Sequence, residues 1–198
     1  MPAPRKNTRV QRTFHVKNMT SSCCIHLLKI LFTADGIEII GIKMGTVTLS
    51  IDPKIITWKS IEATLENYGF EIINQKEKIL VEQIKQAVIE LVHHSTYNAM
   101  VRNSDYLVER FAMSYPYISR LFSKHENITL EKFIILHKIE KVKELIEYGD
   151  LTLSEIAYMM GYSSVQYLST QFKTITGISV TDYKSNPSIE RKSLDSLS

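Results

Sequence analysis

Two groups of side chains in this sequence have types and spacings that suit chemistry with a ligand or a nucleic acid. The first group is the adjacent pair Cys23 and Cys24, followed by His26. Thiolates and imidazoles bind soft metal ions, and a thiol near the start of a helix ionises readily. The second group consists of the Arg, Gln, Ser, Thr and Lys side chains within residues 115–124 and 164–173, which are types that hydrogen-bond to base edges and phosphates. The elements that position each group decide between these chemistries.

The second group lies in an internal repeat within the last hundred residues. At a constant offset of fifty positions, Tyr117, Ile118, Ser119 and Phe122 align with Tyr167, Leu168, Ser169 and Phe172. Asn127 and Gly177 then predict a left-handed end to each helix, and Thr129 and Ser179 predict the cap of the helix that follows. The repeat therefore predicts two copies of one helical unit.

Each copy has the pattern of a short helix, a tight turn and a second helix. In the second copy, Thr152 and Glu155 fit a capping box, and Gly161 predicts the turn. Ser163 and Gln166 fit another capping box, which predicts that the second helix begins there. These signals favour a helix-turn-helix unit in this part of the chain.

The first copy follows the same order. A helix is predicted over residues 104–113, a turn near Ser114 and a second helix over residues 115–125. Pro116 is tolerated in the first turn of the second helix, because the N–H group that it lacks would have no partner there. The chain is thus predicted to carry two helix-turn-helix units in tandem.

A long amphipathic segment separates the two units. Thr129 predicts its cap and Gly149 its end, and the residues between them place apolar side chains at helical spacing. A helix of about 19 residues is roughly 28 Å long. This length is close to the ~34 Å between successive major-groove faces on one side of a DNA duplex. The spacer therefore suits a chain that places its two units in adjacent major grooves.

Two stretches of this region resemble the DNA-binding domain of AraC/XylS-type transcription regulators. They read YPYISRLFSKHENITLEKFI and LTLSEIAYMMGYSSVQYLSTQFKTITGISVTDYK, and the resemblance covers about 80 residues. It implies tandem helix-turn-helix units joined by a long helix, each inserting a recognition helix into the major groove. Carried onto this sequence, the recognition helices are residues 115–124 and 164–175. The resemblance also implies double-stranded DNA as the partner, with RNA polymerase as a further one.

Helix geometry predicts which side chains of the recognition helices face the DNA. Arg120 is expected to contact guanine O6 and N7, Gln166 to contact adenine N6 and N7, and Val165 to touch a thymine methyl group. Lys124 and Lys173 are expected to bind phosphates. The full set of predicted DNA-contacting residues comprises Tyr115, Pro116, Ser119, Arg120, Lys124, Ser164, Val165, Gln166, Ser169, Thr170 and Lys173.

The N-terminal half has a different pattern. Strands are predicted at residues 13–18, 37–43, 46–52 and 70–73, with helices at 23–32 and 58–68 and a hairpin turn at Met44 and Gly45. This βαββαβ order specifies a ferredoxin-like sandwich. The predicted fold class is therefore α+β, with an N-terminal ferredoxin-like domain and an all-α C-terminal domain that holds the tandem helix-turn-helix units.

The segments VKNMTSSCC and NYGFEI resemble a heavy-metal-associated domain, whose strand-to-helix loop binds soft ions such as Cu(I) through two cysteines. Met19 and Cys24 match that loop, but Ser21 stands where the first cysteine belongs. A serine hydroxyl is a hard ligand that does not replace a thiolate for a soft metal. The departure at Ser21 weakens the metal assignment.

Three interpretations of Cys23, Cys24 and His26 therefore stay open. The residues could form an altered site for Cu(I), Zn(II) or Hg(II), in which Cys23 and His26 share one helical face. They could instead respond to oxidants or electrophiles through a reactive thiolate. The third interpretation is a fold kept for packing or dimerisation with no ligand, in which each cysteine is a small apolar residue.

The remaining segments connect and flank the two domains. We expect disordered tails at residues 1–12 and 187–198, domains at 13–75 and 97–186, and a connecting helix within 76–96. The helix at 78–94 could pair two subunits, but its packing on the DNA-binding domain is favoured. His93 and His94 are expected in an ordinary loop rather than a metal site.

Composition restricts the class of protein. The chain has 198 residues, two cysteines and a net charge of +3, and no run of about 18 apolar residues predicts a membrane span. Residues 97–198 carry 12 basic and 12 acidic side chains, so charge alone does not identify the DNA-binding half. We expect a cytoplasmic monomer or homodimer that regulates transcription and is not an enzyme. The alternative is a metal-handling protein whose N-terminal domain carries the function.

Overall fold

The computed structural model describes residues 9–94, 102–185, 191–192 and 194–197. The chain divides into two compact units, an N-terminal unit of residues 1–86 and a C-terminal unit of residues 87–198. The division falls inside helix α3 (Lys76–Ile89), within the segment predicted to connect the domains.

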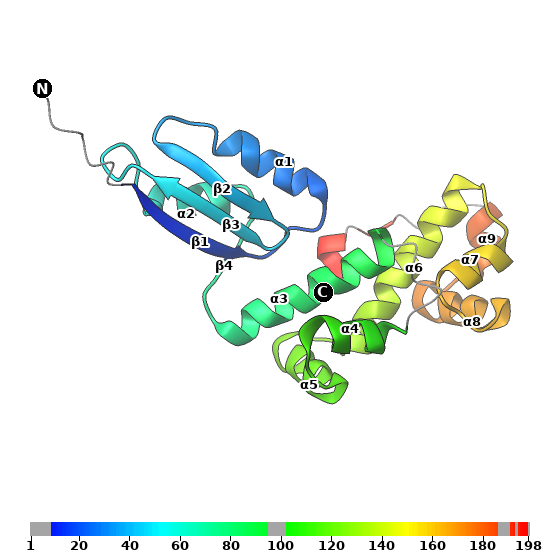
Figure 1. The fold of residues 1–198 in the computed structure, drawn as a ribbon. Helices are drawn as coiled ribbons and strands as arrows, with labels where there is room; N and C mark the ends of the chain where they lie inside the picture. Colours follow the sequence, from blue (N-terminus) through cyan, green and yellow to red (C-terminus); the bar gives the residue numbers. More distant parts are fainter. Residues whose placement is uncertain (1–8, 95–101, 186–190, 193, 198) are drawn as a thin grey trace, which may run out of the picture. The chain divides into compact units, whose positions relative to one another are not determined.

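The N-terminal unit is built on a four-stranded antiparallel sheet with two helices between its strands, followed by the first part of α3 (Figure 1). Its elements are β1 (Val10–Val16), α1 (Ser22–Leu31), β2 (Ile37–Lys43), β3 (Thr46–Ile51), α2 (Trp58–Asn67) and β4 (Ile72–Ile73). The strands lie in the order β2-β3-β1-β4. This arrangement confirms the predicted βαββαβ order and the ferredoxin-like sandwich.

Alternation along the strands produces the core of this unit. Phe14 and Val16 of β1 and Leu49 of β3 point to one face and are buried together with Leu28 of α1 and Leu65 of α2. Burying each such side chain contributes roughly 1.5–3 kcal/mol. The polar residues between them stay outside the core, and the hydroxyls of Thr13 and Thr48 pair across the strands at 2.9 Å.

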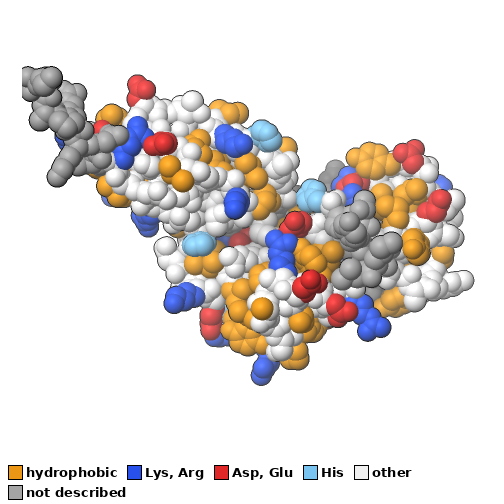
Figure 2. Space-filling model, in the orientation of Figure 1, with side chains coloured by type: hydrophobic (Ala, Val, Ile, Leu, Met, Phe, Trp, Pro, Cys, Tyr) orange, Lys and Arg blue, Asp and Glu red, His pale blue; other side chains and the backbone are white. Residues whose placement is uncertain are grey.

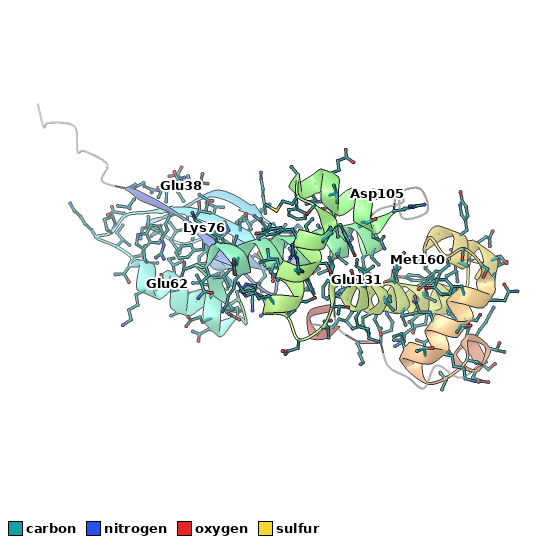
Figure 3. All side chains as sticks on the ribbon, turned by 90° about the horizontal axis from the view of Figure 1, so that it is seen from below. Glu38, Glu62, Lys76, Asp105, Glu131 and Met160 are labelled. Atoms are coloured by element: carbon teal, nitrogen blue, oxygen red, sulfur yellow. The ribbon has the colours of Figure 1, made fainter. Side chains whose placement is uncertain are left out.

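The disordered tail predicted at residues 1–12 is too long. β1 begins at Val10, which pairs with Ile51, whereas residues 1–12 were expected to lack structure. Pairing with β3 extends the strand back to Val10. Beside it, Arg12 donates to the Glu62 carboxylate at 2.7 Å, and Arg9 donates to the Glu38 carboxylate at 2.8 Å. Figure 3 labels both acidic residues.

The described part of the C-terminal unit consists of helices joined by turns and short loops. After the end of α3 it contains η1 (Glu90–His94), α4 (Asn103–Phe111), α5 (Tyr115–His125), α6 (Leu130–Tyr148), α7 (Leu153–Met159), α8 (Val165–Thr176), α9 (Val180–Ser185) and η3 (Leu194–Leu197). Helices α4 and α5 form the first helix-turn-helix unit, α7 and α8 form the second, and α6 is the spacer between them (Figure 1).

Several predicted starts and ends of these helices are confirmed. Thr152 and Glu155 form a complete capping box, and Thr129 accepts a hydrogen bond from the N–H of Lys132. Gly149 ends α6 with φ 74°, and Gly161 and Gly177 also adopt left-handed backbone conformations. Each glycine stops a helix where a side chain would be strained.

Two of the predicted boundaries are wrong by a short distance. Helix α5 ends at His125, and the extended Glu126 follows it, so Asn127 is not the left-handed residue that was expected. The capping box predicted at Ser163 does not form. Instead the Ser164 hydroxyl accepts a hydrogen bond from the N–H of Tyr167 at 3.1 Å, so α8 begins one residue later.

The segment around His93 and His94 is a helix, not the loop that was expected. Helix α3 continues into η1, a π-helical turn that packs against α6. His93 Nε2 lies 3.2 Å from Nδ1 of the buried His137. Burial, with a smaller contribution from Lys141, lowers the pKa of His93 to about 4. This contact agrees with the expectation that the end of the connecting helix packs on the C-terminal domain.

The described residues of the C-terminal tail are also more ordered than expected. Arg191 donates to the Glu144 carboxylate at 2.8 Å, and the N–H of Lys192 donates to Glu140 at 3.0 Å. Leu197 of η3 is buried, and η3 lies against α6. The acidic side chains of α6 explain this order, because they attract a tail segment that has no apolar period of its own.

None of the helices within the described ranges is both long enough and apolar enough to span a lipid bilayer.

Candidate DNA-binding interface

The inner face of α5 anchors the first recognition helix. Ile118, Leu121 and Phe122 are buried, as the spacing of apolar residues predicts. The Phe122 ring packs on the Phe133 ring of α6 with centroids 5.2 Å apart. These contacts fix the rotation of α5 about its axis and turn its polar side chains outward.

The outward face of α5 carries the predicted contacts. Pro116, Arg120 and Lys124 are exposed, and Ser119 is half-buried. Arg120 Nε donates to the backbone oxygen of Pro116 at 3.2 Å, which holds the start of the side chain along the helix. The terminal guanidinium nitrogens have no hydrogen bond within the described residues, so they can meet a base edge.

Two of the predicted contacts of α5 bind a carboxylate of the same chain. The Tyr115 hydroxyl donates to Glu131 Oε1 at 2.9 Å, and the Ser119 hydroxyl donates to the same oxygen at 3.2 Å. Partial burial and the hydrogen bond to Glu131 raise the pKa of Tyr115, which keeps its hydroxyl protonated. Glu131 was not among the residues predicted for this interface.

Helix α8 is anchored in the same manner. Leu168 and Phe172 are buried, and the Phe172 ring lies 5.5 Å from the Tyr183 ring of α9. The predicted contacts Gln166, Thr170 and Lys173 are exposed, whereas Val165 and Ser169 are half-buried. Ser164 caps the helix, so its hydroxyl oxygen already accepts a hydrogen bond from the backbone N–H of Tyr167.

The second recognition helix is tied to the spacer through polar side chains. Lys138 of α6 donates to the backbone oxygen of Met160 at 2.8 Å, and its ammonium group lies 5.6 Å from the centre of the Tyr162 ring. The Tyr162 hydroxyl donates to Gln171 Oε1 of α8 at 2.6 Å. This chain of contacts links α6 to α8 through the turn of the second unit.

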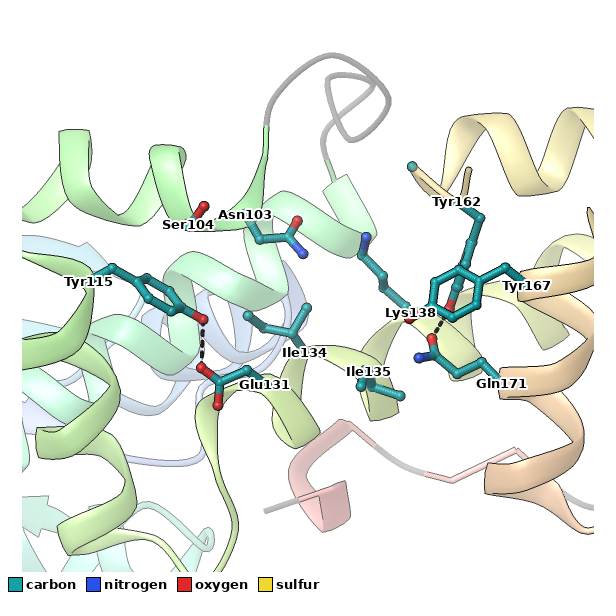
Figure 4. Close-up of a pocket in the computed structure, with 11 residues that line it drawn as sticks. Asn103, Ser104, Tyr115, Glu131, Ile134, Ile135, Lys138, Tyr162, Tyr167 and Gln171 are labelled. Carbon is teal, nitrogen blue, oxygen red and sulfur yellow. Dashed lines mark hydrogen bonds between the residues drawn. The ribbon is translucent and has the colours of Figure 1, made fainter. Parts of the chain in front are cut away.

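A pocket of about 410 Å³ lies along α6 between the two helix-turn-helix units (Figure 4). Glu131, Ile134, Ile135 and Lys138, which repeat at helical spacing, come from α6. Tyr115 lines the side of the first unit, and the second unit contributes the residues Gly161, Tyr162, Tyr167 and Gln171. The exposed face of the spacer therefore forms a surface shared by both recognition helices.

Two further aromatic residues on the recognition helices were not among the predicted contacts. Tyr117 is 43% exposed and Tyr167 is 54% exposed, and the two occupy equivalent positions in the repeat. The repeat itself aligns them, so their matched exposure could have been predicted by placing each on its helix. An exposed ring beside the polar face can stack on sugar or base groups.

Charge is mixed over the C-terminal unit. Figure 2 shows basic and acidic side chains interspersed on the face drawn. This distribution agrees with the equal numbers of basic and acidic residues in the second half of the sequence. Recognition of DNA by this surface would depend on individual side chains held in position more than on general attraction by a positive surface.

The cysteine pair lies at the start of α1. Cys23 is exposed, and Cys24 Sγ lies 3.9 Å from both the Ser21 hydroxyl and the Asn18 backbone oxygen. His26 Nδ1 lies 2.9 Å from the Ser22 backbone oxygen. Within the described ranges, no group of three or more His, Cys, Asp or Glu side chains could hold a metal ion. A site at these residues remains a prediction.

The chain is similar to two curated regulators. It is 25% identical over 130 residues to the Msm operon regulatory protein of Streptococcus mutans serotype c, which is 64% of this chain and 45% of that protein. It is 19% identical over 163 residues to the uncharacterized HTH-type transcriptional regulator YtdP of Bacillus subtilis, which is 80% of this chain and 21% of that protein. The chain thus spans less than half the length of either relative.

Two solved structures are also similar. The C-terminal domain of AraT, a response regulator from Geobacillus stearothermophilus, is 24% identical with a TM-score of 0.48, over 60% of this chain and 94% of that one. The C-terminal domain of the two-component response regulator yesN from Fusobacterium nucleatum is 25% identical with a TM-score of 0.44, over 52% of this chain and 98% of that one.

A family match assigns the C-terminal unit. Residues 107–186 match the family described as a helix-turn-helix domain, and this match agrees with the resemblance noted in the sequence. Residues 107–186 are therefore a helix-turn-helix domain. The helix-turn-helix is a DNA-binding motif, so the match concerns binding by these residues. The match leaves residues 1–106 outside it and gives no support to a heavy-metal-associated domain.

Proposed function

We propose that the chain regulates transcription by binding DNA at two successive major grooves, with α5 in one groove and α8 in the next. The observation that carries this proposal is the repeated unit itself. Two helices with the same buried face and the same exposed face are joined by a single 19-residue spacer inside a helix-turn-helix domain. The names of the two curated relatives, which describe regulators, support the proposal.

Sequence would be read by side chains on the outer faces of the two helices. The exposed Arg120 can donate two hydrogen bonds to guanine, and the exposed Gln166 can pair with adenine. Val165, at the start of α8, can contact a thymine methyl group. Each bidentate pair would give about 1–3 kcal/mol of discrimination against the wrong base.

Phosphate contacts would fix the position of the domain without reading sequence. Lys173 is exposed on α8 and Lys124 is exposed near the end of α5. Because the C-terminal half is neutral overall, few phosphates would be neutralised, and nonspecific affinity would be modest. RNA polymerase is a further proposed partner, on the resemblance alone.

Selection of bound sequences from a random DNA pool by the full chain tests this function. We expect a motif with two boxes spaced by about one helical turn of DNA. Arg120→Ala should relax the preference at one position, whereas Lys173→Ala should weaken binding to all sequences alike. If the wild-type chain enriches no sequence, the proposed function is wrong.

For the N-terminal unit we propose a response to a soft metal ion or a thiol-reactive compound at Cys23 and Cys24. The exposed side chain of Cys23 supports this, since a reagent can reach it. Titration of the full chain with Hg(II), Cu(I) and Zn(II), with Cys23→Ser and Cys24→Ser as variants, tests it. Binding that neither substitution changes would remove both cysteines from any site.

A further inference from the structure

Glu131 lies in the first turn of α6, at the edge of the surface that the proposed function assigns to DNA. Its side chain is exposed, and one carboxylate oxygen accepts hydrogen bonds from both Tyr115 and Ser119. Figure 4 shows the Tyr115 hydroxyl pointing to this carboxylate across the pocket. The two donors lie four residues apart, on one face of α5. A single carboxylate therefore holds the hydroxyl protons of two residues of the first recognition helix.

The carboxylate of Glu131 remains charged near neutral pH. Partial burial alone would raise its pKa, but hydrogen bonds from the backbone, Tyr115, Ser119 and Thr129 together lower it. Its place near the positive end of a 19-residue helix also favours the charged form. Tyr115 and Ser119 thus face a permanent acceptor.

This contact decides what the Ser119 hydroxyl can offer to a base. A serine hydroxyl has one proton to donate and two lone pairs to accept with. When the proton is donated to Glu131, only the lone pairs are left for a partner. In the major groove, adenine N6 and cytosine N4 present donors, whereas guanine O6 and thymine O4 present only acceptors.

The second unit lacks this device. Fifty positions along the repeat, Thr181 takes the place of Glu131 and Val165 takes the place of Tyr115. Within the described residues, the hydroxyl of Ser169, which corresponds to Ser119, has no hydrogen bond. Ser169 can therefore either donate a hydrogen bond to a base or accept one, so it does not select between bases that present donors and bases that present acceptors.

We propose that Glu131 is a specificity-determining residue of the first unit, which makes Ser119 select a base with an exposed amino group, adenine or cytosine, and which opposes nonspecific contact with phosphates. This inference rests on the proposed function. A negative charge roughly 8 Å from a phosphate in water weakens binding about two- to threefold. Salt reduces that part of the effect, because it screens charges at this distance.

The test compares variants of the full chain in the same random DNA selection and in binding to a fixed nonspecific duplex. Glu131→Ala should lose the adenine or cytosine preference at one position and bind nonspecific DNA about two- to threefold more tightly at low salt. Glu131→Gln should show the same gain in affinity but keep the preference, because its amide oxygen still accepts from Ser119. Ser119→Ala should lose the preference at the same position.

Asp150→Asn is the matched control, because it removes one exposed negative charge just beyond the end of α6. It should change neither the preference nor the affinity of the first unit. The proposal is overturned if Glu131→Ala keeps the wild-type preference, or if neither Glu131 variant gains affinity beyond the Asp150 control. If the wild-type chain selects no motif at all, the proposed function itself fails, which is a different result.

Discussion

The two helix-turn-helix units reach the same fold by different means. In the second unit, Thr152 and Glu155 form a capping box, Gly161 makes the turn, and the Ser164 side chain caps the recognition helix. The first unit has none of these within the described residues. Its turn contains Ala112 with φ 50°, and the Ser114 side chain makes no cap hydrogen bond.

The first unit depends instead on contacts between elements distant in sequence. Glu131 accepts from the hydroxyls of Tyr115 and Ser119, and Arg110 of α4 donates to Glu90 of η1 at 2.6 Å. The second unit therefore has local signals in addition to long-range contacts such as that of Lys138 with Met160, whereas the first unit depends on its neighbours. One unit can therefore be recognised from a short stretch of sequence, whereas its copy needs the whole domain.

The largest predicted effect tests whether the two cores are equivalent. Phe122→Ala and Phe172→Ala each remove a fully buried ring, so each should lower the free energy of unfolding by about 3–5 kcal/mol. Urea unfolding of the full chain measures both. A much smaller loss for one of them would show that the two units do not share one packing arrangement.

Acid should weaken the packing of η1 on α6, and η1 in turn contacts the first unit through Glu90 and Arg110. Because burial lowers the pKa of His93 to about 4 in the folded chain, the unfolded chain binds the proton more tightly. The stabilising effect of neutral His93 is complete above about pH 6.5 and is lost as the pH falls toward 4, with a total loss of roughly 2–3 kcal/mol.

Unfolding measured between pH 7 and pH 4, for the wild type and for His93→Gln, checks this expectation. The variant should lose part of the pH dependence. His26 is exposed and lies in the N-terminal unit, so His26→Gln serves as the control. An unchanged pH profile in His93→Gln would contradict the prediction.

Helix caps should separate the two units at smaller magnitude. Thr152→Ala removes the side chain that accepts from the N–H of Glu155, and we expect a loss of about 1 kcal/mol in the free energy of unfolding. Ser114→Ala should change stability by much less, because its side chain makes no such bond. Equal losses in thermal unfolding would argue against the difference between the units.

The smallest expected effect concerns the turns. Ala112→Gly should raise stability by about 0.5 kcal/mol, since relief of the left-handed strain exceeds the greater chain entropy of glycine. Gly161→Ala should lower stability by about 1 kcal/mol for the converse reason. If Ala112→Gly is destabilising instead, the left-handed turn of the first unit is not strained.

Local patterns in the sequence were enough for the N-terminal sandwich and for most helix boundaries. The alternation of Phe14 and Val16 and the capping box at Thr152 depend on neighbouring residues, so they could be read directly. The buried faces of α5 and α8 followed from helical spacing in the same way. DNA contact by individual side chains stays a prediction.

Contacts between elements could not be read in this way. Glu131 lies 16 positions after Tyr115, and Lys138 lies 22 positions before Met160, so no periodic pattern connects them. The hydrogen bonds of Arg191 and Lys192 to α6 link residues still farther apart. Each of these pairs depends on how the helices pack, which local propensity does not specify.

The two anchors of the spacer also limit how this protein can change over evolution. Glu131 and Lys138 lie seven positions apart on α6 and hold opposite units. One residue inserted between them would rotate everything that follows by about 100° and advance it by about 1.5 Å. The hydrogen bond between Glu131 and Tyr115 could then be retained only if the hydrogen bond between Lys138 and Met160 were lost. Substitutions in α6 can therefore accumulate singly, whereas insertions and deletions would have to arrive in near-whole helical turns.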